Sequence, residues 1–263
     1  MRRCVLPFVV VWLFFAGAPA ADILAGPLEP GGTAEIVEVI DGDTVVLEDG
    51  REVRLVGIQA PKLPLGRPGF ETWPLAEDAK RTLEEIALGR TVELRYGGRR
   101  MDRHGRALAH LYDSADGTWI QGEMLRRGMA RVYSFPDNRA LVEEMLTRER
   151  EARGAGRGIW AHPFYRILTP EETGGAIDSF QLVEGRVLEA AIVRGRGYLN
   201  FGEDWQSDFT VFIDPESRRR FEAAGIDIES LEGARLRVRG WLKSFNGPEI
   251  EVTHPEQIEL LER

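Results

Sequence analysis

The sequence contains a single cysteine, Cys4, and it lies in an N-terminal segment that we expect to be removed. The mature chain would therefore have no disulfide, no cysteine-bound metal and no thiol nucleophile. Net positive charge is also missing, because 43 acidic residues outnumber 34 basic ones. Any contact with a polyanion must then depend on a local cluster of basic side chains instead of a generally cationic surface.

No apolar run reaches the roughly 20 residues that a membrane-spanning helix needs. The longest run, residues 5–15, is interrupted by one proline, preceded by Arg2 and Arg3 and followed by small residues at 18–20. This pattern predicts a secretory signal peptide over residues 1–21, with an uncleaved membrane anchor as the alternative. We expect an exported protein, periplasmic or extracellular, that keeps no stable membrane span after cleavage.

The composition of the remaining chain, with 43% hydrophobic and 29% charged residues, excludes a fibre or a disordered protein. A stretch rich in proline and glycine predicts a linker at residues 166–177 between two domains, at 33–165 and 178–263. Residues 166–263 hold 12 basic against 19 acidic side chains, whereas residues 33–165 hold 20 against 22. The first domain is therefore the better candidate for binding a polyanion.

The first domain has the pattern of a small β-barrel with packed helices. Hydrophobic alternation and turn residues predict strands at 34–40, 44–48, 51–58, 91–96 and 106–112, and helices at 75–88, 120–127 and from a cap at Asp137 or Asn138 to about 153. Asp49-Gly50 is a hairpin signal, and Gly89 and Gly128 are typical helix stops. Together these elements predict a mainly β, α+β fold of the OB type.

The second domain shows a similar order of elements. The predicted strands are 181–193, 197–201, 208–213, 234–242 and 249–252, with a helix at 216–224 after the third strand. Three strands, a helix and two strands is the order of an OB fold, and any other small α+β domain is the alternative. The fold class predicted for the whole chain is thus α+β with two successive OB-like barrels.

Three motifs in the first domain resemble the staphylococcal nuclease (thermonuclease) family in order and spacing. They are Val-Ile-Asp-Gly-Asp-Thr at 39–44, Arg-Leu-Val-Gly-Ile-Gln-Ala-Pro at 54–61 and Asp-Arg-His-Gly-Arg-Ala-Leu-Ala at 102–109. The resemblance covers about residues 33–160. It implies a five-stranded OB barrel with three helices and a calcium-dependent attack of water on a phosphodiester.

The resemblance also implies roles for individual residues. Asp43 matches the metal-binding aspartate, Asp41 lies behind it in the same turn, and the backbone carbonyl of Ala60 is a further metal ligand. Arg54 and Arg106 match the two arginines that hold the phosphate and stabilise charge in the transition state, work that suits a guanidinium. The alternatives are an ordinary Asp-Gly turn and ordinary surface salt bridges.

Two positions depart from the family pattern. Where the family has a second metal-binding aspartate and a glutamate that orients or deprotonates water, this chain has Gln59 and Lys62. Gln59 could offer only a weak, neutral oxygen ligand. A lysine ammonium cannot accept a proton and would place a cation beside the intended metal. We therefore expect any Ca²⁺ binding to be weakened, while the phosphate-binding arginines remain.

His104 is the strongest candidate for a substitute base, because a histidine can take a proton near neutral pH. It stands where the family has a ring that can contact the nucleotide, so stacking is an equal alternative. Carboxylates at Glu71, Glu77 and Asp78 could fold back over the site. For Glu77 and Asp78 an ordinary place in the first turn of a helix is favoured.

A basic run supports binding of a polyanion by the first domain. Five arginines fall within 12 residues, namely Arg95, Arg99, Arg100, Arg103 and Arg106. Arg99, Arg100 and Arg103 are candidate substrate-binding residues, although a solvated hairpin edge would look the same. Tyr133 and Phe135 could stack on bases or could close the core.

Three functions remain open from the sequence. The favoured one is an exported thermonuclease-like protein that binds nucleic-acid phosphodiesters through its first domain with an incomplete calcium-dependent hydrolytic site. The second is an active metal-dependent endonuclease that uses a substitute base. The third is an envelope interaction or scaffold protein that retains only the fold. The acidic second domain favours a protein partner over nucleic acid.

Overall fold

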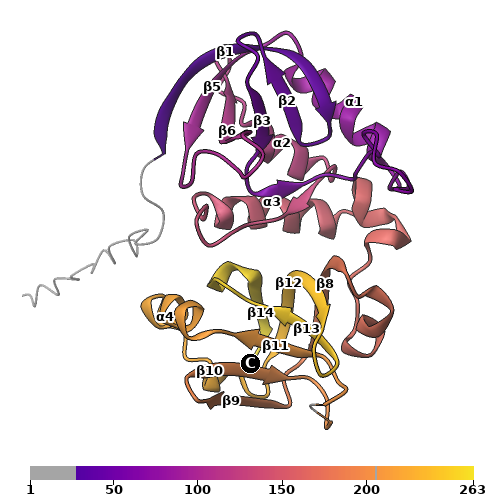
Figure 1. Cartoon of the computed structure of the whole chain (residues 1–263), viewed down its shortest axis with the longest axis vertical. Helices are drawn as coiled ribbons and strands as arrows, with labels where there is room; N and C mark the ends of the chain where they lie inside the picture. Colours follow the sequence, from indigo (N-terminus) through magenta and orange to yellow (C-terminus); the bar gives the residue numbers. More distant parts are fainter. Residues whose placement is uncertain (1–27, 205) are drawn as a thin grey trace, which may run out of the picture.

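The first barrel is built by five strands that close on themselves in the computed structural model, which describes residues 28–204 and 206–263 (Figure 1). The strands are β1 (Glu29–Asp41), β2 (Thr44–Leu47), β3 (Glu52–Leu55), β5 (Thr91–Tyr96) and β6 (Ala107–Asp113). Their order is β1-β2-β3-β6-β5, and β3 runs parallel to β6. This confirms the predicted five-stranded barrel. The predicted signal peptide, residues 1–21, lies outside the described residues.

The strand boundaries follow local chemistry and differ from the prediction at two places. The predicted strand at 51–58 is divided into β3 and β4 (Ile58–Gln59) at Gly57, whose φ is +83°. A side chain at this positive φ would be strained, which favours glycine at the break between the two strands. β1 begins earlier than predicted, because residues 29–35 pair with β5.

Three helices cover the barrel: α1 (Ala76–Ala87), α2 (Ile120–Arg126) and α3 (Val142–Gly154). The first two lie where predicted and are followed by left-handed glycines, Gly89 and Gly128. The prediction was wrong for the start of α3, because neither Asp137 nor Asn138 is its N-cap. The side chain of Asn138 donates instead to the backbone carbonyl of Arg99, and the helix begins four residues later.

The segment that joins the two barrels is folded. Short 3₁₀ helices η1 (Gly158–Ala161), η2 (Pro163–Tyr165) and η3 (Pro170–Ala176) follow α3. The Tyr165 hydroxyl donates to the carbonyl of Pro74 over 2.6 Å, which fixes the start of the segment on the first barrel. Leu168 is buried in the core of the second barrel, and Thr173 is fully buried. The predicted linker residues therefore pack as part of the structure.

The second domain repeats the strand order of the first. Its elements are β8 (Ser179–Arg186), β9 (Glu189–Val193), β10 (Arg196–Asn200), β11 (Thr210–Ile213), α4 (Pro215–Ala223), η4 (Glu229–Leu231), β12 (Arg235–Ser244), β13 (Pro248–Glu251), η5 (Pro255–Gln257) and β14 (Ile258–Glu262). The path β9-β10-β11-β13-β12-β8 returns to the bend between β8 and β9, and β11 is parallel to β13. The single strand predicted at 181–193 is therefore divided by a bend into β8 and β9. The pairing of β14 with β12 was not predicted.

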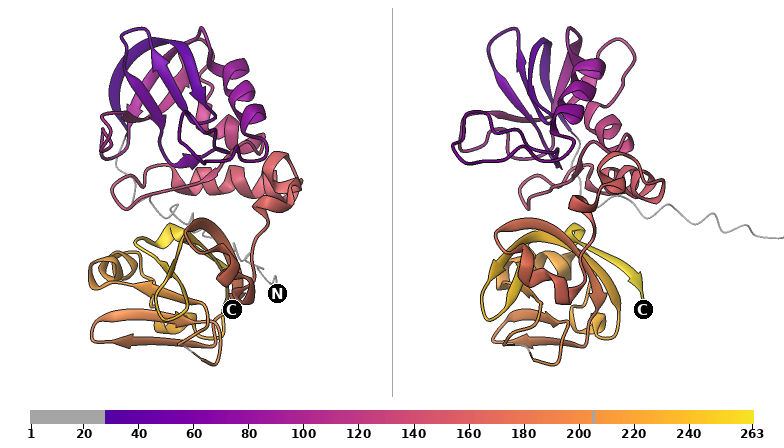
Figure 2. Two further views of the ribbon diagram at one scale, coloured as in Figure 1. Left: turned by 45° about the vertical axis from the view of Figure 1, so that its right-hand side comes forward. Right: turned by 90° about the vertical axis from the view of Figure 1, so that its right-hand side faces the viewer.

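The two barrels meet along α3, which lies on the side of the first barrel that faces β12 and β14 (Figures 1 and 2). Arg239 of β12, only 1% exposed, forms ion pairs with Glu149 of α3 and Glu259 of β14 at 3.0 and 2.6 Å. Arg153 pairs with the same two carboxylates at 2.7 and 3.3 Å. A buried ionic network therefore joins the domains.

Among the described residues, no helix is long and apolar enough to cross a membrane.

A buried histidine lies at the same interface. His254 is fully buried; its Nε2 lies 2.7 Å from the Ser134 hydroxyl and its Nδ1 lies 2.9 Å from the Thr253 hydroxyl. Burial, with the charges of nearby Arg139, Arg220 and Arg239, lowers the pKa of His254 to about 3. Both ring nitrogens have hydroxyl partners and the surroundings are cationic, so the folded protein holds this ring neutral.

We expect the free energy of unfolding to fall as the pH decreases from about 6.5 to 5. The pKa of His254 is about 3 in the folded chain, and burial lowers that of His110 to about 4, against roughly 6.5 when unfolded. The unfolded chain therefore binds more protons in this range, at up to about 1.4 kcal/mol per pH unit for each histidine. Urea unfolding of the parent and of His254→Gln measures the slope. An equal slope in both proteins would show that His254 does not contribute.

Candidate nucleic-acid interface

A cluster of two aspartates and one lysine lies at the end of β1. Asp41 ends the strand, Asp43 follows in the tight turn into β2, and the Asp43 N–H donates to Asp41 Oδ1 over 3.0 Å. Gly42 between them is required, because a Cβ there would lie 2.6 Å from Cβ of Ala60. Lys62 Nζ lies 2.6 and 2.7 Å from the two carboxylate oxygens of Asp43 and 3.3 Å from Asp41 Oδ2. The ammonium thus bridges both aspartates.

The charges of this cluster are balanced in spite of burial. Burial alone would raise the pKa of the fully buried Asp43, but the charges of Arg54 and Lys62 hold it at about 2. Burial and the charge of Asp43 raise the pKa of Asp41. Asp43 is therefore a carboxylate at neutral pH, and its negative charge is already paired with two cations of the chain.

The cluster as built does not fit a hard divalent cation. Such ions require several converging oxygen ligands, but here the Lys62 ammonium contacts both oxygens of Asp43. Gln59 Oε1 accepts two hydrogen bonds from Arg131, at 3.0 and 2.8 Å, and the N–H of Ala60 donates to Asp43 Oδ2. Within residues 28–204 and 206–263, no three His, Cys, Asp or Glu side chains are grouped to hold a metal.

Arg54 connects the cluster to a neighbouring pocket. Its Nη2 lies 3.2 Å from Asp43 Oδ2 and donates to the carbonyl of Ile58 over 2.7 Å, while Nη1 donates to the carbonyl of Leu55 over 2.9 Å. These partners fix the guanidinium on β3. Removing Arg54 would therefore disturb the fold of the strand as well as any ligand contact.

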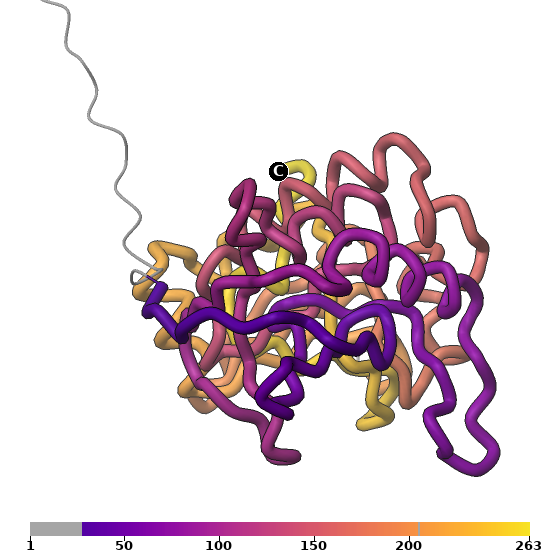
Figure 3. The backbone as a smooth tube through the Cα atoms, turned by 90° about the horizontal axis from the view of Figure 1, so that it is seen from above, coloured from indigo at the N-terminus to yellow at the C-terminus, as the bar shows by residue number. Residues whose placement is uncertain are grey.

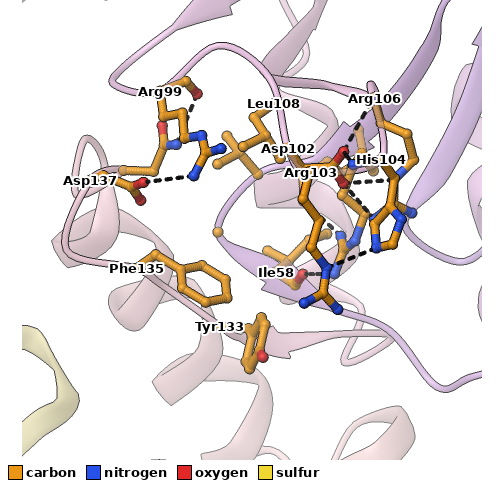
Figure 4. Close-up of a pocket in the computed structure, with 15 residues that line it drawn as sticks. Ile58, Arg99, Asp102, Arg103, His104, Arg106, Leu108, Tyr133, Phe135 and Asp137 are labelled. Carbon is orange, nitrogen blue, oxygen red and sulfur yellow. Dashed lines mark hydrogen bonds and ion pairs between the residues drawn. The ribbon is translucent and has the colours of Figure 1, made fainter. Parts of the chain in front are cut away.

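The pocket has a volume of about 470 Å³ and collects most of the predicted ligand-binding residues (Figure 4). Its lining includes Arg54, Arg99, Arg103, His104, Arg106, Tyr133 and Phe135, together with Asp102, Asp137 and Asn138. Figure 4 shows Arg103, His104 and Arg106 on one wall and Arg99 with Asp137 opposite. Arg100 lies elsewhere: it pairs with Glu29 at 2.5 Å and its guanidinium lies over the ring of Tyr96.

The loop at 102–106 is held by Asp102. Its Oδ1 accepts from the N–H groups of His104 and Arg106, and its Oδ2 accepts from Arg106 Nε over 2.8 Å. Arg103 Nε donates to His104 Nε2 over 3.1 Å, which makes that ring nitrogen an acceptor. The loop therefore presents two guanidinium groups and an imidazole ring to the pocket.

Comparison with known proteins shows which family the first domain is similar to. A family model for staphylococcal nuclease homologues matches residues 52–162. Protein ParB of Escherichia coli is 34% identical over 158 residues, which cover 56% of this chain and 83% of that protein. The chain belongs to the staphylococcal nuclease family.

Two relatives in this family come from Bacillus subtilis (strain 168). Endonuclease YncB is 31% identical over 131 residues, 48% of this chain and 60% of that protein. The SPbeta prophage-derived endonuclease YokF is 31% identical over 141 residues, 50% of this chain and 46% of that protein. The chain thus spans less than two thirds of each. The family model itself begins after Asp43 and ends before the second barrel.

Several residues of this family member's site were not found from its sequence. Asp102 and Asn138 line the pocket, and Arg131 binds Gln59. Phe180 of the second barrel contacts Tyr133 edge-on, with 4.7 Å between ring centroids, and lies under the guanidinium of Arg131. Asp102 could have been suspected from its motif, but the contacts of Phe180 depend on how the two domains pack.

The alternative carboxylates do not reach the pocket in the described structure. Glu77 and Asp78 lie in the first turn of α1, which is the ordinary helix position that the sequence favoured for them, and Asp78 pairs with Arg81. Glu71 is exposed in the loop between β4 and α1, which extends away from the barrel (Figure 3). Only His104 among the four candidate bases lines the pocket.

Proposed function

We propose that this protein is exported and binds nucleic-acid phosphodiesters in the arginine-lined pocket, with a hydrolytic site that is incomplete for calcium-dependent cleavage. The observation that carries the proposal is the position of Lys62 Nζ, 2.6 and 2.7 Å from the oxygens of Asp43. The chain supplies its own cation at the place where the family resemblance predicts a metal. Such a cation neutralises the aspartate but neither activates water nor accepts a proton.

The pocket supports binding in its present form. Arg103 and Arg106 offer guanidinium donors suited to phosphate oxygens. Tyr133 and Phe135 meet edge-to-face at 4.9 Å and form an aromatic wall on which a base can stack. A single-stranded nucleic acid exposes its phosphates and its unpaired bases together. Single-stranded DNA or RNA is therefore the substrate class that the pocket suits best.

A second candidate is cleavage without a bound metal, with His104 as the base. It is favoured by the position of His104 in the pocket wall beside Arg103 and Arg106, and it requires Arg103 Nε to release His104 Nε2, to which it donates over 3.1 Å. The test must therefore record cleavage as well as binding.

The expected result is retention of labelled single-stranded DNA or RNA, with equal affinity in Ca²⁺ and in EDTA and with little or no cleavage. Gel shift of the full mature chain at fixed salt measures retention, and denaturing gels of the same samples measure cleavage. Robust Ca²⁺-dependent cleavage that disappears in Asp43→Asn would overturn the proposal. Cleavage that persists in EDTA and is lost in His104→Ala would establish the second candidate.

Arg103→Ala is expected to weaken oligonucleotide binding by about 10- to 150-fold, because a charged hydrogen bond contributes about 1.5–3 kcal/mol. The matched control is Arg100→Ala, which removes the same charge from the same run but lies outside the pocket. It should bind within about threefold of the parent, since exposed pairs contribute little. Equal losses in both variants would indicate diffuse attraction and no defined pocket.

A further inference from the structure

A second pocket lies on the outer face of the second barrel. The strands β9 and β10, which contribute to it, lie at the end of that barrel remote from the first one (Figures 1 and 2). The pocket has a volume of about 390 Å³ and is formed by β9, β10, β11, β13 and the turn between β12 and β13. This is the face that OB folds use for ligands, formed by the second and third strands and the loop between the last two.

The pocket has one polar row across four strands. Glu189 of β9 stands opposite Asn200 of β10, Asn200 opposite Thr210 of β11, and Thr210 beside Glu249 of β13. Asn200 Nδ2 donates to Glu189 Oε2 over 3.3 Å, and the Thr210 hydroxyl donates to Asn200 Oδ1 over 3.2 Å. Hydrogen bonds thus connect Glu189, Asn200 and Thr210, and the row has a carboxylate at each end.

Aromatic rings accompany this row. Tyr198, next to Asn200 along the same face of β10, packs against Phe212 at 5.6 Å between ring centroids. Phe245, in the turn after β12, also lines the pocket and is 68% exposed, the highest value among the large apolar side chains of the described structure. The ring of Phe245 is therefore open to a ligand in this pocket.

The charge of this pocket is opposite to that of the first. It is lined by two glutamates and by no lysine or arginine among the residues that the structure describes. The neighbouring Glu251 is neutralised by Lys243 at 2.7 Å, but within the same described part Glu189 and Glu249 form no ion pair. Burial and the charge of Glu251 raise the pKa of Glu249, against a smaller lowering by the charge of Lys243, its neighbour across the strand pair. A half-buried carboxylate whose neighbouring lysine pairs with another acid gains from a cation brought by a ligand.

We propose that this pocket binds an alkylammonium group, the chemistry shared by polyamines and lysine side chains. Glu189 and Glu249 would neutralise the ammonium, while Tyr198 and Phe245 contact its methylene groups and offer ring faces to the charge. A polyanion is repelled by the two carboxylates, and a neutral sugar would leave their charges unpaired. This site is independent of the nucleic-acid function proposed for the first domain.

Calorimetric titration of the full mature chain tests the proposal with three probes: spermidine, a short lysine-containing peptide, and the same peptide with acetylated lysines. We expect spermidine or the lysine peptide to bind and the acetylated peptide to fail. Spermidine binding assigns the site to polyamines, and binding of the peptide alone assigns it to a protein partner. No binding of either cation, or equal binding of the acetylated peptide, would overturn the proposal.

Variants separate the pocket from general attraction to an acidic surface. Glu249→Gln and Phe245→Ala are each expected to weaken binding by about tenfold, whereas the charge-matched control Glu222→Gln, on α4 and outside the pocket, stays within about twofold. Equal effects of Glu249→Gln and Glu222→Gln would contradict a defined site. Oligonucleotide binding should be unchanged in Glu249→Gln, so this test can fail while the function proposed for the first domain stands.

Discussion

Replacement of Arg239 by methionine is expected to lower the free energy of unfolding by about 3–5 kcal/mol, the cost of leaving buried charges without their partner. Arg239 donates to both oxygens of Glu149 over 3.0 Å and to Glu259 over 2.6 Å. Glu149 also accepts from the N–H of Val132 over 2.6 Å. Without Arg239, Glu149 keeps only Arg153 as an ion-pair partner, and Glu259 keeps Arg153 with the more distant Arg237 and Arg150, although both carboxylates are almost excluded from water.

Urea denaturation followed by circular dichroism measures this loss. Arg235→Met is the control, because Arg235 lies on the same strand and its side chain is half exposed in a pair with Glu184. That variant should lose less than about 1 kcal/mol, the usual range for exposed pairs. Similar losses in the two variants would mean that the network between the barrels does not hold the domains together. A separate early transition in Arg239→Met would show that the domains unfold independently once it is removed.

The double replacement Gln59→Asp with Lys62→Glu is expected to raise Ca²⁺-dependent cleavage by about 10²- to 10⁴-fold, the usual contribution of a general base. It removes the ammonium from Asp43, adds two carboxylates, and restores the family pattern at the end of β4 and just after it. Direct titration with Ca²⁺ should show binding that is absent or weaker in the parent. Oxygen-rich, anionic sites are those that Ca²⁺ prefers.

The control for this gain is the same double variant with Asp43→Asn, which should abolish both the Ca²⁺ binding and the cleavage. Ca²⁺ binding without cleavage would show that Arg54 and Arg106 are not placed to stabilise the transition state. High activity in the unaltered parent would contradict the role given to Lys62. The comparison therefore separates loss of the metal from loss of phosphate positioning.

Much of the fold could be predicted because local signals agree with the global structure. The strand at 91–96 was predicted residue for residue from its alternation, and Gly89 and Gly128 end helices as predicted. The start of α3 was missed because the Asn138 side chain donates a hydrogen bond to the carbonyl of Arg99 instead of capping the helix. β14 was missed because it follows a short 3₁₀ turn and pairs with β12, on the side of β12 away from the preceding strand β13.

The site was predictable where it lies within motifs. The pocket gathers Arg54, His104 and Arg106, which the resemblance had singled out. It excludes Arg100, because the direction of a side chain within a basic run cannot be read from spacing alone. The contact of Phe180 with Tyr133 joins residues from different barrels, and no periodicity within either domain encodes such a contact. The roles of Gln59 and Lys62 in catalysis remain predictions.

The folded segment between the barrels changes what two pockets on one chain can do together. A flexible tether would let a second binding event occur at an effective concentration set by linker length. Here Thr169 and Glu172 cap η3, and Leu168 exchanges backbone hydrogen bonds with β8. The separation of the two pockets is therefore a fixed length. A ligand or assembly that joins a phosphate chain to a cationic group would occupy both proposed pockets at once only if its own span matches that length. The gain in affinity from binding at two sites would therefore depend on the geometry of the ligand.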